Sequence, residues 1–325
     1  MNEQPILAVE DLQTYFFTNT GVVKAVDGVS FELRKGETLG IVGESGSGKS
    51  MTAWSILRLV PEPAGRIVGG KILYQGEDLL EKSQAEMQEI RGSGICMVMQ
   101  DPLTSLNPVF NIGNQIIECL RMDSTPSGQS LSERAIELLA EVHIPAPRSR
   151  IAAFPHQMSG GMRQRVVGAI AISRSPNLLI ADEPTTSLDA TIQLQYLRML
   201  KEIQAQTGAG IIFITHDFGI VARMCDRVAV MYAGKIVEHA DVEQLFDNPA
   251  HPYTEALLQS VPNLDTDVDL LPSIEGQPPS LDDLPEGCAF APRCAYAFDK
   301  CSEYPPEFSV ETGHSARCWR HHVNN

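Results

Sequence analysis

The sequence contains no apolar run close to the roughly 18 residues that a membrane-spanning helix requires. Residues 1–5 are polar and acidic, so they lack the apolar centre of a secretory signal peptide. We therefore expect a protein that neither spans a membrane nor is exported across one. Any role at a membrane must then depend on partner subunits.

Basic residues are also few: 25 lysines and arginines face 41 aspartates and glutamates, and the formal charge is −16. Nucleic-acid binding depends on clustered lysine and arginine to neutralise phosphates, so we expect no nucleic-acid partner. The apolar content of 43% across 325 residues is instead typical of a soluble globular protein with a sizeable core. No internal repeat is visible.

Residues 1–260 alternate β-branched runs with helical patterns, which indicates an α/β domain. Apolar runs without polar alternation, as in a parallel sheet covered on both faces, predict strands at 39–42, 178–181 and 211–215. Antiparallel strands are expected at about 5–33 and 228–237. Helical patterns lie at roughly 49–59, 131–143, 160–174 and 190–206.

The composition changes after residue 260. Residues 261–286 contain seven acidic side chains and no basic one, and eight prolines lie within 261–325. Proline is rare in long helices and central strands, so 261–325 is predicted to be an acidic, proline-rich linker followed by a small, loop-rich module. Such a module has little hydrophobic core of its own, so it needs a cross-link such as a bound metal to be stable.

A glycine-rich segment at residues 43–50, GESGSGKS, follows a predicted strand and opens a predicted helix. It fits the phosphate-loop pattern G-x-x-x-x-G-K-S in the context that the pattern requires. Glycines let successive N–H groups point at phosphates, the lysine reaches the β- and γ-phosphates, and the last serine ligates Mg²⁺. We therefore expect ATP and Mg²⁺ to be bound here by Gly43, Ser45, Gly46, Gly48, Lys49 and Ser50.

Polar side chains follow three other apolar strands, at the sheet edge where α/β proteins bind ligands. Asp182 is predicted to hold Mg²⁺ through water, and Glu183 to polarise the attacking water. Gln100 ends another strand, where its amide can sense Mg²⁺ and that water. His216 is predicted to contact the γ-phosphate. The alternatives are a solvated strand-end charge for Glu183 and a structural role for His216.

Two further segments have candidate roles. Residues 101–108 are turn-rich, which suits a mobile segment that carries a nucleotide signal to a partner. Tyr15, Phe16 and Phe17 offer an aromatic plane for adenine, and we select Phe16 among them. Packing in the core is the equally supported alternative for these rings.

A second glycine-rich turn, MSGGMRQR at residues 158–165, precedes a predicted helix. Ser159, Gly160 and Gly161 offer a hydroxyl, backbone N–H groups and a positive helix end to an anion. The first phosphate loop already serves the nucleotide bound by its own chain. This turn is therefore predicted to complete the ATP site of another subunit.

These motifs, in their order, resemble those of the ATP-binding subunits of ABC transporters. The match spans residues 1–260 and comprises the phosphate loop, Gln100, the Ser-Gly-Gly signature, Asp182-Glu183, the turn at 187–189 and His216. The resemblance implies a P-loop NTPase core with an antiparallel β subdomain and a helical signature subdomain at about 101–175. It also assigns Glu183 as the catalytic base and His216 as the γ-phosphate sensor.

In that family two such domains pack head to tail, and each ATP lies between one subunit's phosphate loop and the other's signature helix. Met162 departs from the general signature, which ends in glutamine. With DEPTTSLD at 182–189 and HPYT at 251–254, the methionine form resembles the first of two ATPase subunits in oligopeptide and dipeptide importers. Because methionine lacks an amide's hydrogen bonds, Ser159 and the backbone are expected to hold the partner's ATP.

This resemblance implies several partners. They are a second ABC ATPase subunit, two transmembrane permease subunits and an exported substrate-binding protein. It also implies a peripheral position on the cytoplasmic face of the inner membrane, held there through the permeases.

Four cysteines, Cys288, Cys294, Cys301 and Cys318, lie in the last 38 residues. Disulfides are disfavoured without an export signal, and the spacings lack the short knuckle of structural zinc sites. A [4Fe–4S] cluster also takes four cysteines, with spacings that vary between families. The peptide-importer ATPases that this region resembles carry such a cluster, so the resemblance implies one here. Zinc and unmetallated thiols stay open, and a structural role is favoured over a sensory one.

No residue of this chain is expected to touch the transported solute, so importers of nickel, oligosaccharides or haem are alternatives. Non-transport ABC ATPases of DNA repair carry coiled-coil insertions and those of translation carry two ATPase domains, and neither feature is present in 325 residues. A regulatory iron–sulfur protein with a vestigial ATPase is disfavoured by the intact Lys49, Asp182, Glu183 and His216. The sequence thus predicts an ATPase that energises a peptide importer.

Overall fold

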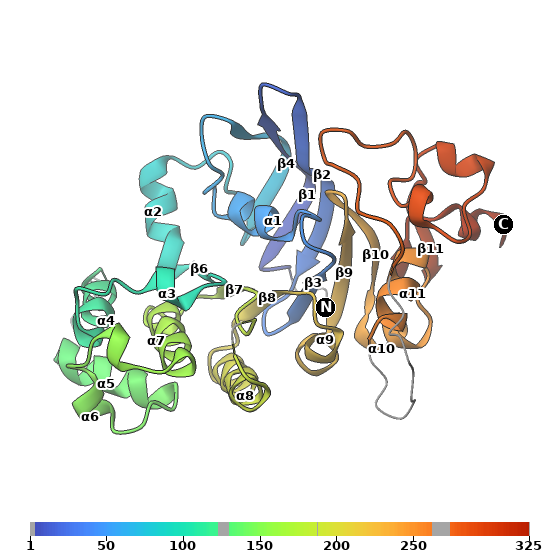
Figure 1. Ribbon diagram of the computed structural model, residues 1–325. Coiled ribbons are helices and arrows are strands. Elements are labelled where there is room, and N and C mark those ends of the chain that lie inside the picture. Colours follow the sequence, from blue (N-terminus) through green and yellow to red (C-terminus); the bar gives the residue numbers. More distant parts are fainter. Residues whose placement is uncertain (1–3, 123–129, 187, 262–273, 325) are drawn as a thin grey trace. The chain divides into compact units, whose positions relative to one another are not determined.

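A computed structural model describes residues 4–122, 130–186, 188–261 and 274–324. Most of the predicted linker, residues 262–273, lies outside these ranges, as does Ser187 of the predicted turn. The chain divides into two compact units (Figure 1). Unit 1 comprises Met1–Arg34, Thr38–Glu81 and Phe213–Asn325, and unit 2 comprises Lys35–Glu37 and Lys82–Ile212.

Unit 1 contains an antiparallel sheet of order β2-β1-β4-β5. Its strands are β1 (Leu7–Phe17), β2 (Val22–Leu33), β4 (Gly65–Tyr74) and β5 (Glu77–Asp78). Leu7 stands opposite Leu33 on one side and Tyr74 on the other, and all three are buried. The antiparallel strands expected near the start of the chain are therefore confirmed.

The second sheet of unit 1 begins with β3 (Thr38–Val42), which pairs in parallel with β9 (Arg227–Tyr232). Strand β9 then pairs in an antiparallel manner with β10 (Lys235–Asp241), as the sequence predicted. The C-terminal segment adds a hairpin to this sheet, because β12 (His314–Ala316) pairs with β10 and β11 (Phe308–Glu311) pairs with β12.

A buried ion pair fixes this hairpin. The carboxylate of Glu238 on β10 accepts hydrogen bonds from His314 Nε2 at 2.8 Å and from the N–H groups of Ala250 and His251. Glu238 and His314 are each 1% exposed. The hydrogen bond to Glu238 raises the pKa of His314. Leaving either charge unpaired here would be costly, so the C-terminal hairpin and β10 stabilise each other.

The remaining elements of unit 1 are short. Asp217 caps α9 (Phe218–Met224) by accepting from the N–H groups of Gly219 and Ile220. His251 caps α11 (Pro252–Gln259), where its Nδ1 accepts from Tyr253 N. The helices are α1 (Lys49–Ile56), α9 (Phe218–Met224), α10 (Val242–Asp247), α11 (Pro252–Gln259) and the 3₁₀ turns η2 (Ala291–Arg293), η3 (Asp299–Ser302) and η4 (Trp319–Asn324).

Unit 2 combines two parallel strands with a group of helices. Strand β6 (Ile95–Val98) pairs with β7 (Leu178–Asp182), and β8 (Gly210–Thr215) runs from unit 2 into unit 1. The helices are α2 (Gln84–Ser93), α3 (Pro102–Ser105), α4 (Ile112–Arg121), α5 (Leu131–Glu141), α6 (Pro147–Arg150), η1 (Pro155–Gln157), α7 (Gly160–Ile172) and α8 (Ala190–Thr207).

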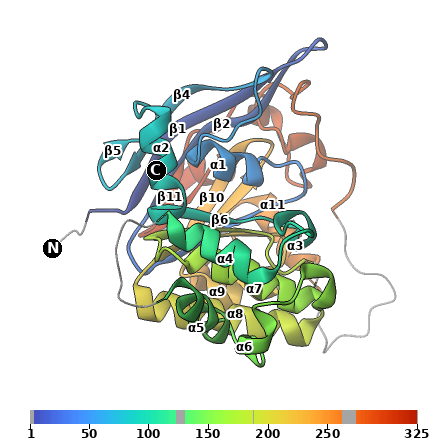
Figure 2. The same cartoon turned by 90° about the vertical axis from the view of Figure 1, so that its left-hand side faces the viewer.

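Helices α4, α5 and α7 pack against one another (Figure 2). Each contributes fully buried apolar side chains, such as Ile116 on α4, Leu139 on α5 and Val166 on α7. Within the described ranges, no helix combines the length and the apolar character needed to cross a bilayer.

Candidate functional site

The phosphate loop of residues 43–50 joins β3 to α1 in unit 1. Gly48 has a φ of +103°, and a Cβ there would lie 2.3 Å from the carbonyl oxygen of Ala25. A Cβ on Gly43 would lie 2.2 Å from the carbonyl oxygen of Met231. Both glycines are therefore required by the close approach of other strands to the loop.

Lys49 lies at the centre of this loop and is only 5% exposed. Its Nζ donates to the carbonyl oxygens of Gly43 and Glu44, each at 2.8 Å, and contacts Ser47 Oγ at 3.4 Å. The ammonium group is thus held against the backbone of the loop. Ser50 follows it in the first turn of α1 and is exposed.

Sequence reasoning missed two residues that support the loop. Tyr253 Oη accepts a hydrogen bond of 2.8 Å from Glu44 N, and Arg293 forms an ion pair with the Glu44 carboxylate at 2.7 Å. Tyr253 belongs to the HPYT segment and Arg293 directly precedes Cys294. Both segments carried a family resemblance, but no local pattern linked them to the loop.

Unit 2 brings two predicted residues together. Gln100 Nε2 donates to Glu183 Oε2 at 3.0 Å, and Thr186 Oγ1 donates to the same oxygen at 3.0 Å. Asp182 is 5% exposed at the end of β7. Glu183 adopts a φ of +44°, a left-handed conformation that is uncommon outside glycine and is often associated with functional sites.

The signature turn caps α7, as its position before a helix predicted. Ser159 Oγ accepts a hydrogen bond of 3.3 Å from Met162 N, so its hydroxyl serves the helix end. A Cβ on Gly161 would lie 2.4 Å from Ile192 Cγ2 of α8, whereas Gly160 has open space around it. Gly161 is therefore required by helix packing, and Gly160 leaves the backbone accessible.

The other predicted ATP-site residues are distributed between the units. His216 is exposed immediately after β8, in unit 1 with the phosphate loop. Phe16 on β1 is half-buried beside Gly65, whose added Cβ would lie 2.7 Å from Phe16 Cε1. The hydroxyl of its neighbour Tyr15 donates to Asp27 at 2.5 Å. Asp189, the last residue of the turn predicted at 187–189, caps α8.

The four C-terminal cysteines line one cavity of about 20 Å³, together with Phe290 and Trp319. Among the described residues, however, no three His, Cys, Asp or Glu side chains are arranged to hold a metal ion. Burial raises the pKa of Cys288 to about 11, so its thiol is protonated at neutral pH. Four thiols converging on one cavity form a donor set of the kind that binds a metal centre.

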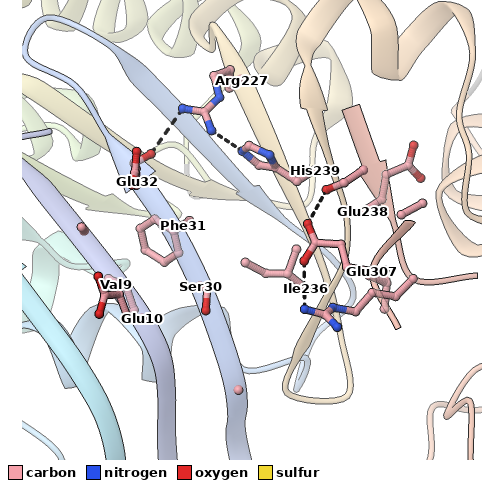
Figure 3. Close-up of a pocket in the computed structure, with 16 residues that line it drawn as sticks. Val9, Glu10, Ser30, Phe31, Glu32, Arg227, Ile236, Glu238, His239 and Glu307 are labelled. Atoms are coloured by element: carbon pink, nitrogen blue, oxygen red, sulfur yellow. Dashed lines mark hydrogen bonds and ion pairs between the residues drawn. The ribbon is translucent and has the colours of Figure 1, made fainter. Parts of the chain in front are cut away.

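A larger cavity of about 300 Å³ lies elsewhere in unit 1 and is lined by none of the predicted site residues (Figure 3). Several of its polar side chains contact one another. Arg227 lies 2.7 Å from His239 Nε2, and Glu307 accepts from Ser315 and Arg317. Burial and then Arg227 lower the pKa of His239 to about 4, so the imidazole is neutral.

Two protein families match this chain. The ABC transporter family covers residues 26–186, and the family described as the oligopeptide/dipeptide transporter C-terminal region covers residues 237–301. The C-terminal match begins in β10, so it includes Glu238, the HPYT segment and the first three of the four cysteines.

Similar proteins agree with these matches. A probable peptide ABC transporter ATP-binding protein of Sinorhizobium fredii is 49% identical, over 97% of this chain and 95% of its own length. The oligopeptide transport ATP-binding protein OppD of Bacillus subtilis is 50% identical, over 98% of this chain and 89% of its own. The solved structure of cbiO1 from Clostridium perfringens, titled as part of the ABC transporter complex cbiONQ, has a TM-score of 0.65 and 26% identity, with 76% and 92% coverage.

The phosphate loop, the signature turn and the paired Gln100 and Glu183 are therefore carried by an ABC ATPase fold. This chain belongs to the ATP-binding proteins of the ABC transporter family.

Proposed function

We propose that this protein hydrolyses ATP to energise a membrane importer of dipeptides or oligopeptides. The observation that carries the proposal is the hydrogen bond between Gln100 and Glu183, since it places an amide and a carboxylate together at the ends of two parallel strands. The peptide substrate is supported by the C-terminal family match and by relatives named as peptide transport proteins.

In the proposed hydrolysis, water attacks the γ-phosphorus and the bond from that phosphorus to the β,γ-bridging oxygen breaks. The products are ADP and phosphate, and Glu183 accepts the proton of the attacking water. Gln100 orients the Glu183 carboxylate through the 3.0 Å hydrogen bond. Lys49 offsets charge on the β- and γ-phosphates, and His216 contacts the γ-phosphate. Phe16 stacks on adenine.

Gly43, Ser45, Gly46 and Gly48 line the phosphate groups with the loop backbone. Ser50, Gln100 and Asp182 are the proposed Mg²⁺ ligands, with Asp182 acting through water; the hydroxyl, amide and carboxylate oxygens suit a hard cation. When bound, Mg²⁺ neutralises charge that develops on the transferred phosphoryl group.

We also propose the domain organisation and partners. Residues 1–260 form the ATP-binding domain, and 261–325 form the linker and four-cysteine module. The chain pairs head to tail with a second ATPase subunit, and residues 100–108 contact two permease subunits. An exported binding protein delivers the substrate, and the complex holds this chain on the cytoplasmic face of the inner membrane.

Co-expression with candidate permease subunits and a second ATPase subunit, followed by reconstitution in vesicles, tests this function. We expect ATP-dependent uptake of a labelled peptide, with ATPase activity stimulated by the peptide-loaded binding protein. A complex that hydrolyses ATP and imports nickel or an oligosaccharide, but no peptide, would refute the peptide assignment and leave the ATPase intact.

Ser159 provides a test of the head-to-tail arrangement. We expect Ser159→Arg to lower ATPase activity of the assembled complex about tenfold, because it blocks the partner's γ-phosphate, while ATP affinity of the isolated chain changes by less than about twofold. Ser130→Arg is the matched control, since Ser130 is an exposed capping serine that accepts from Glu133 N on α5. Equal losses in both variants would indicate only a lost helix cap.

We further propose that Cys288, Cys294, Cys301 and Cys318 ligate a [4Fe–4S] cluster that staples the C-terminal module. Their convergence on one small cavity supports this, as does the four-thiolate donor set. Because thiolates are the ligands, and burial raises the pKa of Cys288, cluster assembly must release protons.

Anaerobic purification should yield a brown protein with iron and acid-labile sulfide in equal amounts. Cys294→Ser should lose most of both, whereas Cys119→Ser, outside the module, should retain them. A colourless protein with stoichiometric zinc would exclude the cluster in favour of a zinc site. A metal-free protein would exclude both and indicate that the four thiols bind no metal.

A further inference from the structure

Glu44, the second residue of the phosphate loop, is held at three points by other residues of unit 1. Its carbonyl oxygen accepts from Lys49 Nζ at 2.8 Å, and its N–H donates to Tyr253 Oη at 2.8 Å. Its carboxylate accepts two hydrogen bonds from Arg293, at 2.7 and 3.0 Å. A single loop residue therefore connects the phosphate-binding lysine to two residues more than 200 positions later in the chain.

Arg293 is built into the fold rather than lying on the surface. Its side chain is 5% exposed, and that of Glu44 is 27% exposed. Besides the two bonds to Glu44, Arg293 donates from Nε to the carbonyl oxygen of Glu275 and from Nη1 to Tyr232 Oη. A planar guanidinium held on several edges loses little further entropy on pairing, so this contact is stronger than an exposed ion pair.

An aromatic cluster fixes Tyr253 and Arg293, the two distant hydrogen-bond partners of Glu44. The ring of Tyr253 lies 4.6 Å from that of Tyr232 and 5.3 Å from that of Phe290, measured between centroids. Phe290 is 2% exposed and precedes Arg293 by three residues, with Arg293 N donating to its carbonyl oxygen. Packing of Phe290 thus sets the position of the turn that carries Arg293.

We propose that Arg293 and Tyr253 are positioning residues for ATP binding, acting on the phosphate loop through Glu44. They hold the curved backbone that presents Lys49 to the phosphates. The C-terminal segment is therefore a support of the ATP site and not only an appendage to it. The inference rests on the nucleotide-binding role proposed for the loop. It concerns how tightly ATP is held rather than how it is hydrolysed, because Glu183 and Gln100 are not involved.

A double-mutant cycle on the full-length chain tests this, with the Kd for fluorescent ATP as the readout. Arg293→Met and Glu44→Gln should each raise Kd about tenfold, and the double variant should be no weaker than the weaker single one. Arg293→Lys should recover part of the loss. In the assembled ATPase, KM for ATP should rise while kcat at saturating ATP stays within about twofold.

Arg317→Met is the matched control, because Arg317 lies in the same C-terminal segment but pairs with Glu307, at 3.0 Å, and not with Glu44. Its Kd for ATP should stay within about twofold of the wild type. Wild-type affinity in Arg293→Met, additive effects in the double variant, or an equal loss in Arg317→Met would overturn the inference. Absence of ATP binding in the wild-type chain would instead contradict the nucleotide-binding role.

Discussion

Glu183→Gln should lower ATP turnover of the assembled complex about a thousandfold while leaving ATP binding nearly intact. The substitution preserves the shape of the side chain but removes the carboxylate that accepts a proton from the attacking water. Gln100 and Thr186 both donate to Glu183 Oε2, and an amide oxygen can still accept from them. Phosphate release and retention of labelled ATP would be measured on the same preparation.

Glu202→Gln is a suitable control for this result. Glu202 lies on α8 in the same unit, and its side chain is 55% exposed, with His143 Nε2 3.5 Å from its carboxylate. Its neutralisation should leave turnover unchanged. Normal hydrolysis by Glu183→Gln in the complex would remove Glu183 from the role of base, and loss of ATP binding would indicate a positioning role instead.

Lys49→Met should raise the Kd for ATP about a hundredfold, because a buried ammonium group is lost from the centre of the phosphate loop. Lys49 donates to the carbonyl oxygens of Gly43 and Glu44 and is 5% exposed. Methionine keeps the apolar stem and limits damage to packing. Titration of the full-length chain with fluorescent ATP measures the effect.

Lys71→Met serves as the comparison, since Lys71 is exposed on β4 and far from the loop in sequence. It should bind ATP as the wild type does, and both variants should unfold at similar temperatures. If Lys49→Met retained wild-type affinity, the GESGSGKS segment would not be a phosphate-binding loop.

The helices whose ends carry capping residues were predicted most accurately. Helix α7 was expected at 160–174 and spans Gly160–Ile172, and α8 was expected at 190–206 and spans Ala190–Thr207. Ser159 and Asp189 cap them through side-chain oxygens. Capping and helical periodicity act within a few residues, so the sequence displays them directly.

The role of the signature glycines could be predicted only in part. Two glycines after a serine indicated accessible N–H groups at a helix end. The structure assigns Gly161 a different constraint, since its Cβ would meet Ile192 of α8. Helices α4 and α11 were not predicted.

Tertiary contacts in the C-terminal segment also escaped prediction. The proline-rich composition correctly indicated loops, yet β12 pairs with β10 and His314 buries its imidazole against Glu238. Glu238 directly follows the strand predicted at 228–237, and a glutamate is expected to be solvent-exposed unless it is paired. Only the fold reveals that its carboxylate satisfies two backbone N–H groups and a histidine at once.

The sequence by itself determined the chemistry of this protein and the order of its motifs. A phosphate loop, a signature turn and strand-end carboxylates depend on residue types at short, defined spacings, which can be recognised from the sequence alone. Tertiary structure alone decided which side chains hold these motifs in place: Gln100 bonds Glu183 across 83 residues, and Arg293 bonds Glu44 across 249. Such contacts depend on where packing brings distant segments, which no local pattern encodes.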